Sequence, residues 1–225
     1  MHLISQATID GLRAFDSATI FNALVRHGGL PNEEYTDHTI RCLLPDLGAV
    51  VGYAMTAEVT TNDPDTTALD WPDYYAVLEA AQGPLVAVLK DVDSRPGRGA
   101  SFGDGMATVH KRLGVVGAIV DGTVRDLAGI QSVGLPIWAW GTVPGHGVFH
   151  VTRINTPITV GQLRIRPGDL ILADSDGCVR IPNEQADEIL RLASEVRAME
   201  AEIFDFYHSP EFSVAAMRAR LNRAR

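Results

Sequence analysis

Two short runs of aliphatic residues constrain the fold of this chain more than any other feature. Residues 85–89 and 115–120 are almost continuously apolar, and residues 102–113 between them have helical spacing. Continuous apolar strands are typical of a parallel sheet that is covered on both faces. The segment therefore predicts a βαβ unit with a right-handed crossover.

The same alternation continues on both sides of this unit. Helices are predicted at residues 15–27, 71–81 and 127–133. Strands are predicted at residues 40–44, 50–60 and 137–140, with a turn joining the first two. Asp16 or Ser17 would cap the first helix. We therefore expect an α/β fold.

The character of the chain changes after Gly141. Residues 148–181 break into short strands separated by turn residues, which favours antiparallel pairing. A long helix, capped by Asn183, is predicted to follow. Its apolar stripe needs either its own domain or a neighbouring subunit to cover it. The stripe consists of Ile189, Leu192, Val196, Met199 and Ile203.

Length and composition limit the class of protein. The 225 residues suit one domain, with residues 183–225 as a helical C-terminal extension. The apolar runs are too short to span a membrane, and no signal peptide is recognisable at the N-terminus. Cys42 and Cys178 lie in apolar runs and read as buried free thiols, which favours the cytoplasm. A net charge of −9 argues against a nucleic-acid partner.

Two charged turns follow predicted strands and open predicted helices. One contains Asp104, and the other is the pair Arg125 and Asp126. Taken singly, each has an ordinary explanation: Ser101 and Asp104 fit a capping box, Asp126 fits an N-cap, and Arg125 fits a surface ion pair. Together they place three charged groups at one end of a βαβ unit, where open α/β sheets bind ligands.

Dinucleotide binding is one alternative for this region. Gly97 and Gly99 follow an apolar strand, and the next strand ends in Asp121. However, the third glycine, Gly103, comes one position too late for the dinucleotide fingerprint. The glycines are also separated from the strand by several polar residues, so this alternative is the weaker one.

A metal and carboxylate site fits the same residues better. Backbone amides of Gly105 and Met106 at a helix N-terminus suit a carboxylate, and the guanidinium of Arg125 suits bidentate carboxylate binding. Asp104 and Asp126 supply the oxygen ligands that Mg²⁺ prefers. A 2-oxo acid would match this set, because its carboxylate and its ketone oxygen need different partners.

These motifs resemble a known family. The similar segments are GDGM at 103–106, GAIVDGTVRD at 117–126, GLPI at 134–137, PGD at 167–169 and ADSDG at 173–177. They resemble the family of the regulators of ribonuclease activity A and the 4-hydroxy-4-methyl-2-oxoglutarate aldolases. The resemblance covers most of the chain, from about residue 47 to residue 182.

The resemblance implies a swivelling β/β/α domain with a mixed central sheet, flanking helices and a long C-terminal helix. It implies homotrimers or homohexamers with sites at subunit interfaces. The implied reaction is class II retro-aldol cleavage of a 4-hydroxy-2-oxo dicarboxylate to pyruvate through a metal-bound enolate. Oxaloacetate decarboxylation is the implied side activity.

The resemblance also implies residue roles. Asp126 would bind Mg²⁺ or Mn²⁺ directly, and Asp104 would hold the metal through water. Arg125 would bind the carboxylate and keto groups of the substrate and serve catalysis together with Asp104. The remaining substrate-binding positions would be Gly103, Gly105 and Met106. A glutamate from a neighbouring subunit contributes in the aldolases, and Glu200 and Glu202 are both candidates.

Some positions depart from the family pattern. Asn22 stands where many relatives carry an aspartate, and residues 138–140 and 145–150 are unusual, so they could line a different specificity pocket. His146 and His150 read as ordinary loop and strand histidines rather than a metal pair. The alternative function is a non-catalytic regulator that binds a ribonuclease or another protein. The retained Asp126 favours the enzyme.

Overall fold

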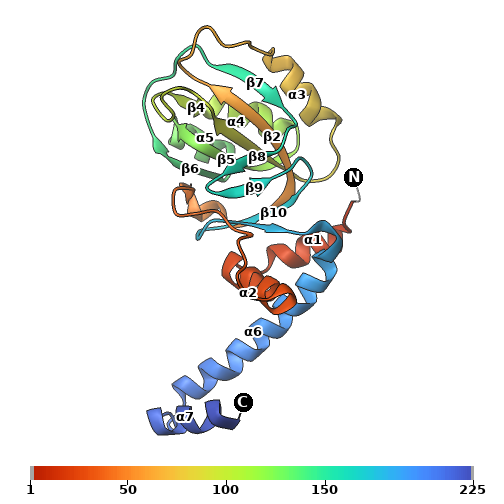
Figure 1. Cartoon of the computed structure of the whole chain (residues 1–225), viewed down its shortest axis with the longest axis vertical. Helices are drawn as coiled ribbons and strands as arrows, with labels where there is room; N and C mark the ends of the chain where they lie inside the picture. Colours follow the sequence, from red (N-terminus) through yellow and green to blue (C-terminus); the bar gives the residue numbers. More distant parts are fainter. Residues whose placement is uncertain (1–2, 224–225) are drawn as a thin grey trace.

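The computed structural model describes residues 3–223 and is built around a mixed sheet of nine strands (Figure 1). The strand order is β1-β6-β5-β3-β2-β10-β11, and β4 and β7 pair with β5 and β2. The strands are β1 (Arg41–Cys42), β2 (Val50–Thr60), β3 (Leu85–Asp91), β4 (Ala100–Phe102), β5 (Val115–Val124), β6 (Ile137–Thr142), β7 (His150–Ile154), β10 (Leu170–Ala173) and β11 (Cys178–Ile181). The α/β prediction is confirmed.

The parallel half of the sheet contains the predicted βαβ unit. Strands β2, β3, β5 and β6 are parallel neighbours. Helices α3 (Trp71–Ala80), α4 (Asp104–Arg112) and α5 (Leu127–Val133) pack on one face of these strands. The predicted start of the middle helix at residue 102 is wrong, because residues 100–102 instead form β4 and pair with the end of β5.

The other half of the sheet is antiparallel, as predicted. Strand β2 pairs with β7 and β10, and β10 pairs with β11. A separate hairpin of β8 (Ile158–Val160) and β9 (Leu163–Ile165) covers the face opposite the helices. The predicted turn between two strands at 40–60 is confirmed: a 3-10 turn (Pro45–Leu47) leads from β1 to β2. The two strands are not paired with each other, because β1 pairs with β6.

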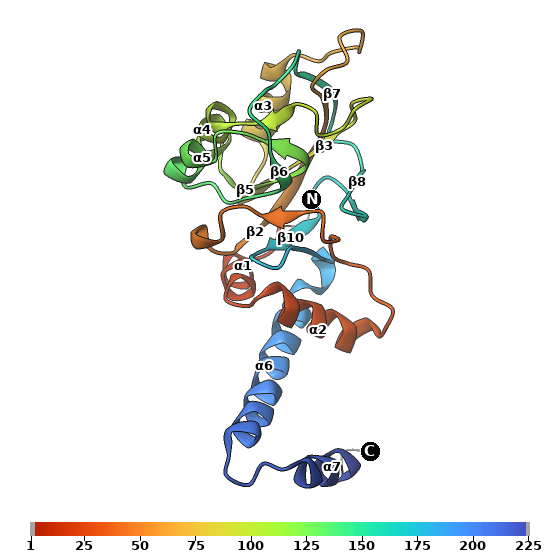
Figure 2. The same cartoon turned by 90° about the vertical axis from the view of Figure 1, so that its left-hand side faces the viewer.

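Helices from both ends of the chain pack together below the sheet (Figures 1 and 2). Helices α1 (Gln6–Arg13) and α2 (Ser17–Gly28) contact α6 (Ala186–His208), and the buried side chains of α6 in this contact come from its first half. Asp16 caps α2 by accepting a hydrogen bond from the backbone of Thr19. Helix α1 was not predicted from the sequence.

The long helix α6 extends away from the sheet, and a turn after its last residue leads into α7 (Val214–Arg223), as Figure 2 shows. Asn183 does not cap it; it lies in a 3-10 turn (Asn183–Gln185), and its side chain bonds the backbone of Gly168 and Leu170. The first part of the predicted stripe is buried, whereas Met199 and Ile203 are 48% and 36% exposed. The stripe therefore lies on its own domain only up to Val196.

Two sequence expectations about environment can be compared with the structure. Cys178 is buried and Cys42 is half-buried, and both are free thiols. Burial raises the pKa of both thiols, so they are poor nucleophiles. Within residues 3–223, no helix combines the length and apolar character needed to cross a membrane.

Candidate functional site

The end of β5 delivers Arg125 and Asp126 to the edge of the sheet. The backbone N–H of Arg125 donates to the carbonyl of Phe102 in β4 at 2.9 Å, which fixes the turn. Asp126 follows in the left-handed region, with φ of 59°. That conformation costs a residue with a Cβ about 1 kcal/mol, although aspartate tolerates it better than most. Non-glycine residues held in this conformation are typical of functional sites.

The side chains of this turn form an exposed ion pair. The Nε of Arg125 lies 3.2 Å from Oδ2 of Asp126, and the side chains are 38% and 42% exposed. Asp126 occupies the N-cap position of α5, but its carboxylate makes no capping hydrogen bond. The ordinary N-cap explanation is therefore wrong for its side chain. The carboxylate is directed to Arg125 and remains accessible.

Gly103 packs directly against this pair. It is the N-cap residue of α4, and a Cβ at this position would lie 3.1 Å from Oδ2 of Asp126 and 3.4 Å from Nε of Arg125. A Cβ at this position would therefore require the pair to shift by a few tenths of an ångström. Around Gly105, in contrast, an added Cβ would meet no atom within 4 Å. The first turn of α4 thus has open space beside the charged turn.

Asp104 joins the two turns. It is the first residue of α4, its Oδ1 accepts a hydrogen bond from the Gly105 backbone at 2.7 Å, and its side chain lies against Gly129 of α5. Asp104 therefore directly follows Gly103, on which Arg125 and Asp126 pack, while its own side chain faces α5. The capping box with Ser101 does not form, because Ser101 is in β4 and fully buried.

A buried histidine that no sequence motif marks lies on the inner face of α4. His110 is fully buried, donates from Nδ1 to the carbonyl of Met106 at 2.7 Å and accepts at Nε2 from the hydroxyl of Tyr74 at 2.9 Å. Burial lowers the pKa of His110 to about 4, so it is neutral at pH 7. Its only sequence signal is its place on the buried face of the helix.

The structure argues against the dinucleotide alternative, because the backbone amide of Gly97 is not free to bind a phosphate. The N–H of Gly97 donates to the carboxylate of Asp91 at 2.7 Å, and Asp121 accepts from the indole of Trp140 at 2.8 Å. Asp91 is buried, and burial raises its pKa. The Asp91 carboxyl group therefore holds the glycine loop, a role that the sequence did not indicate.

The other predicted specificity residues do not form a single pocket. Trp138 is fully buried and donates to the carbonyl of Asp174 at 2.6 Å, so the suggestion that it lines a pocket is wrong. His146 is exposed, and His150 lies in β7. Across residues 3–223, no group of three or more histidine, cysteine, aspartate or glutamate side chains could hold a metal.

The candidate glutamates lie on the protruding helix. Glu200 accepts a hydrogen bond from the side chain of Asn22 at 3.3 Å, and both Glu200 and Glu202 are on the outer half of α6. This part of α6 extends away from the sheet that carries Arg125 (Figure 1). Within one chain, therefore, neither glutamate joins the site.

Comparison with known proteins agrees with the fold and the motifs. The sequence profile of the RraA-like family, described as Aldolase/RraA, matches residues 17–180. A protein of Halalkalibacterium halodurans, provisionally named 4-hydroxy-4-methyl-2-oxoglutarate aldolase, is 33% identical over 199 residues, 87% of each chain.

Solved structures extend the comparison. A Streptomyces coelicolor protein, described as an unusual member of the RNase ES inhibitor RraA protein family, is 29% identical with a TM-score of 0.72, covering 91% of this chain and 98% of that one. An uncharacterised Pseudomonas syringae protein, 22% identical with a TM-score of 0.77, shares the fold over 98% and 96% of the two chains. The chain belongs to the RraA-like (Aldolase/RraA) family.

Proposed function

We propose that this protein is a divalent-metal-dependent carbon–carbon lyase that cleaves a 4-hydroxy-2-oxo dicarboxylate to pyruvate. One observation carries the proposal: the ion pair of Arg125 and Asp126 lies on Gly103, beside Asp104 and the open first turn of α4. This arrangement combines an anion-binding helix end, a guanidinium fork and two carboxylates. A 2-oxo acid would use the helix end and the guanidinium directly, and the two carboxylates through the metal ion that they would hold.

The residues fit Mg²⁺ or Mn²⁺ better than zinc. Asp126 would hold the ion directly and Asp104 through water, and all of these donor atoms are oxygens. Mg²⁺ is usually bound by one or two carboxylates with substrate and water completing the shell, so the lack of a third ligand among residues 3–223 is compatible with it. When bound, the ion would supply Lewis-acid stabilisation of negative charge on the keto oxygen.

The residues of the chain would orient the substrate. Arg125 would bind the 2-oxo acid end, and the amides of Gly105 and Met106 would bind its carboxylate. The Gly105 amide donates to Oδ1 of Asp104 at 2.7 Å in this structure, so the substrate carboxylate would take over that hydrogen bond. In the reaction the C4 hydroxyl loses its proton and the C3–C4 bond breaks, so that C4 becomes the carbonyl carbon of the second product, which is released. The electron pair remains on C3 as pyruvate enolate, which then takes up a proton. The fixed charge of Arg125 would stabilise the negative charge that develops.

Oxaloacetate decarboxylation follows from the same arrangement. Loss of CO₂ from oxaloacetate leaves the same pyruvate enolate, and protonation of its C3 gives pyruvate. Arg125 would therefore serve both reactions in the same way. The two substrates differ only in the group that leaves from C3, which is CO₂ for oxaloacetate and the C4 carbonyl product for the aldol substrate.

The proposal includes a homotrimer or homohexamer with sites at the subunit interfaces. The outer half of α6 supports it, because Met199, Phe204 and Tyr207 are exposed there at 44–52% within one chain. A second copy would cover these side chains. Glu200 or Glu202 would then be placed near the site of the neighbouring subunit.

Pyruvate release tests the proposal. The full-length protein is incubated with 4-hydroxy-4-methyl-2-oxoglutarate or oxaloacetate, with Mg²⁺ or Mn²⁺, and with EDTA as the metal-free control. We expect metal-dependent pyruvate formation that falls about 10²–10³-fold in Arg125→Lys, because an ammonium group cannot replace the bidentate fork. Arg164→Lys, an exposed change on β9, should be unaffected. Equal rates in both variants would refute the role of Arg125.

A second candidate is a non-catalytic regulator of a ribonuclease. The similarity to the Streptomyces coelicolor protein, which is described as a member of an RNase ES inhibitor family, favours it. This protein would bind its partner through an acidic surface, consistent with the net charge of −9. Recovery of a ribonuclease by the purified protein, unchanged by Asp126→Ala, with no pyruvate formation, would favour the regulator over the enzyme.

A further inference from the structure

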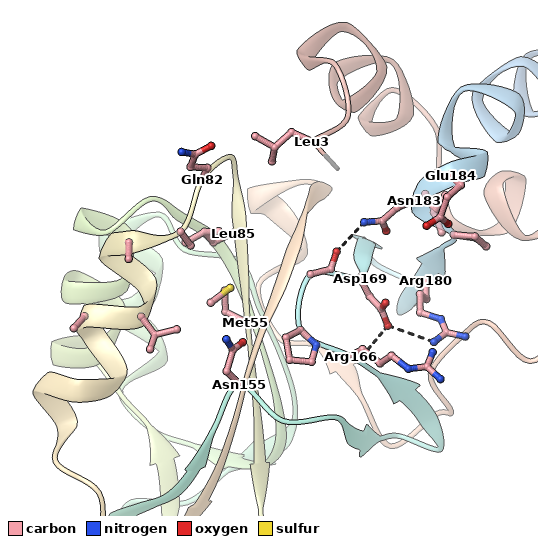
Figure 3. A pocket seen from close by; sticks show the side chains of 18 residues that line it. Leu3, Met55, Gln82, Leu85, Asn155, Arg166, Asp169, Arg180, Asn183 and Glu184 are labelled. Carbon is pink, nitrogen blue, oxygen red and sulfur yellow. Dashed lines mark hydrogen bonds and ion pairs between the residues drawn. The ribbon is translucent and has the colours of Figure 1, made fainter. Parts of the chain in front are cut away.

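A large cavity opens at the end of the sheet opposite to Arg125. Its volume is about 1170 Å³, and it lies between α3 with the start of β3 on one side and the ends of β9 and β11 on the other. Figure 3 shows Leu85, Met55 and Asn155 on one wall and Asp169, Arg180 and Asn183 on the facing wall. The volume exceeds the usual range for small-molecule sites, so a ligand of that class would fit.

The cavity is separate from the proposed catalytic site. Leu85, the first residue of β3, lines it and pairs with Val115, the first residue of β5. Arg125 follows the last residue of the same strand. With 10 residues, β5 spans roughly 30 Å at about 3.3 Å per residue. A molecule in the cavity would therefore not contact the ion pair of Arg125 and Asp126.

One wall of the cavity is apolar and open. Ala76 and Ala80 are one turn apart on α3 and both are exposed, and Val77 and Met55 continue the surface inward. Small side chains on an exposed helix face leave room that larger ones would fill. An apolar body could thus lie along α3 and displace water from these side chains.

The polar side chains of the facing wall fall into two groups. Arg180 binds Glu34 and Asp169. The side chain of Asn183 donates to the carbonyl of Gly168 and accepts from the N–H of Leu170, so the hydrogen-bonding groups of both residues already have partners. The side chain of Arg166, by contrast, makes no hydrogen bond or ion pair with any residue in the described part of the chain. Arg166 lines the cavity with its guanidinium, which in Figure 3 points away from Met55 and Leu85, to the side of Arg180, and would turn toward the cavity to bind a ligand.

Other polar groups of the lining are also available. The side-chain amides of Gln82 and Asn155 and the carboxylate of Glu184 have no hydrogen-bond or ion-pair partner among residues 3–223. Asn155 is held in the left-handed region at φ of 58°. Glu184 is the opposing charge at the rim. It would disfavour an anion that approached it, so the anionic group is expected at Arg166.

We propose that this cavity binds an amphipathic organic anion, with its carboxylate or sulfonate on Arg166 and its apolar body along Ala76 and Ala80. The two amides at Gln82 and Asn155 would hydrogen-bond polar atoms along its length. Charged hydrogen bonds to a guanidinium are strong enough to select an anion over a neutral molecule of the same length. The site is distinct from the one proposed for the 2-oxo acid.

A displacement assay tests the proposal on the full-length protein. Anilinonaphthalene sulfonate serves as the fluorescent probe, and octanoate and octanol compete for it. We expect octanoate to displace the probe at least about ten-fold more effectively than octanol, and Arg166→Gln to remove that difference. Glu184→Gln should leave octanoate binding unchanged or tighten it. Arg164→Gln, two residues away on the exposed face of β9, is the matched charge control.

A second variant tests the cavity itself. Ala80→Trp should fill the apolar wall and abolish displacement by both competitors, while the unfolding temperature shows that the variant is folded. Arg125→Ala should leave octanoate binding intact, which separates this site from the catalytic proposal. Equal octanoate affinities of the parent and Arg166→Gln would overturn the proposal. A second result would also overturn the proposal: the parent protein binds neither competitor, and Ala80→Trp dissociates the oligomer. The cavity would then be covered by a second copy of the chain rather than by a small anion.

Discussion

The side chain of Asp104 lies in direct contact with Gly129. A Cβ at Gly129 would come within 2.6 Å of both Cβ and Oδ2 of Asp104, closer than real Cβ atoms approach. The first turn of α4 therefore approaches α5 closely only because position 129 has no side chain. Asp104 and Asp126, at the starts of these two helices, depend on the same contact for their relative position.

Gly129→Ala should weaken metal binding and catalysis together. The added methyl group must displace Asp104, and a small displacement of a positioned catalytic group costs up to about 10²-fold in rate. We expect a lower Mn²⁺ affinity in an electron paramagnetic resonance titration and at least ten-fold slower pyruvate release. Gly28→Ala, where an added Cβ would meet no atom within 4 Å, is the control. Unchanged Mn²⁺ affinity in Gly129→Ala would contradict the role assigned to Asp104.

A pair of substitutions at position 126 separates charge from backbone conformation. Asparagine tolerates the left-handed region, so Asp126→Asn should keep the free energy of unfolding within about 0.5 kcal/mol and still lose most activity. Asp126→Ala should lose activity and also about 1 kcal/mol of stability, because alanine is strained at φ of 59°. Urea unfolding and pyruvate release measure the two effects. Full activity in Asp126→Asn would exclude a metal-binding carboxylate there.

His110 should make the protein acid-sensitive. Its pKa is lowered from 6.5 to about 4 in the folded protein, so the unfolded chain binds the proton first as the pH falls. The stability is complete above pH 6.5 and is lost progressively between pH 6.5 and about 4, by roughly 3 kcal/mol. His110→Gln should flatten this part of the profile, measured by urea unfolding at several pH values, and the exposed His146→Gln should not. An unchanged profile in His110→Gln would contradict the assignment.

The inner and outer halves of α6 should respond differently to truncation. Leu192 is buried against the N-terminal helices, and Leu192→Ala should cost about 2–5 kcal/mol of unfolding free energy. Met199 is 48% exposed in one chain, so Met199→Ala should leave that free energy nearly unchanged but weaken association. Denaturation and sedimentation velocity report the two effects. If Met199→Ala sediments like the parent protein, this part of α6 is not a subunit interface.

The parallel strands were predictable because a strand buried on both faces consists almost entirely of apolar residues. Residues 85–89 and 115–120 are apolar on both faces, and they form the core strands β3 and β5. The short strand at 100–102 was not predictable, because it exists only through pairing with the distant end of β5. Asn183 resembled a helix cap by its residue type, but backbone groups of Gly168 and Leu170 take its hydrogen bonds.

The same distinction applies to the candidate site. Arg125 and Asp126 are adjacent in sequence, so their proximity could be predicted from the order of residues alone. The contact of Asp104 with Gly129 could not, since it depends on how closely two helices approach. The hydrogen bond between Tyr74 and His110 joins residues 36 positions apart in the sequence, and no local pattern marks it.

Strand β2 connects the three buried clusters of the protein and so determines how it unfolds. Its residues belong to all three buried clusters: Val51 to the one beneath the terminal helices, Ala54 to the one beneath the β8–β9 hairpin, and Ala57 to the one beneath α3 and α4. It also pairs with β3, β7 and β10. None of the three buried clusters can therefore separate from the other two without losing contacts to this strand. The amides of β2 should exchange with deuterium only when the whole molecule unfolds.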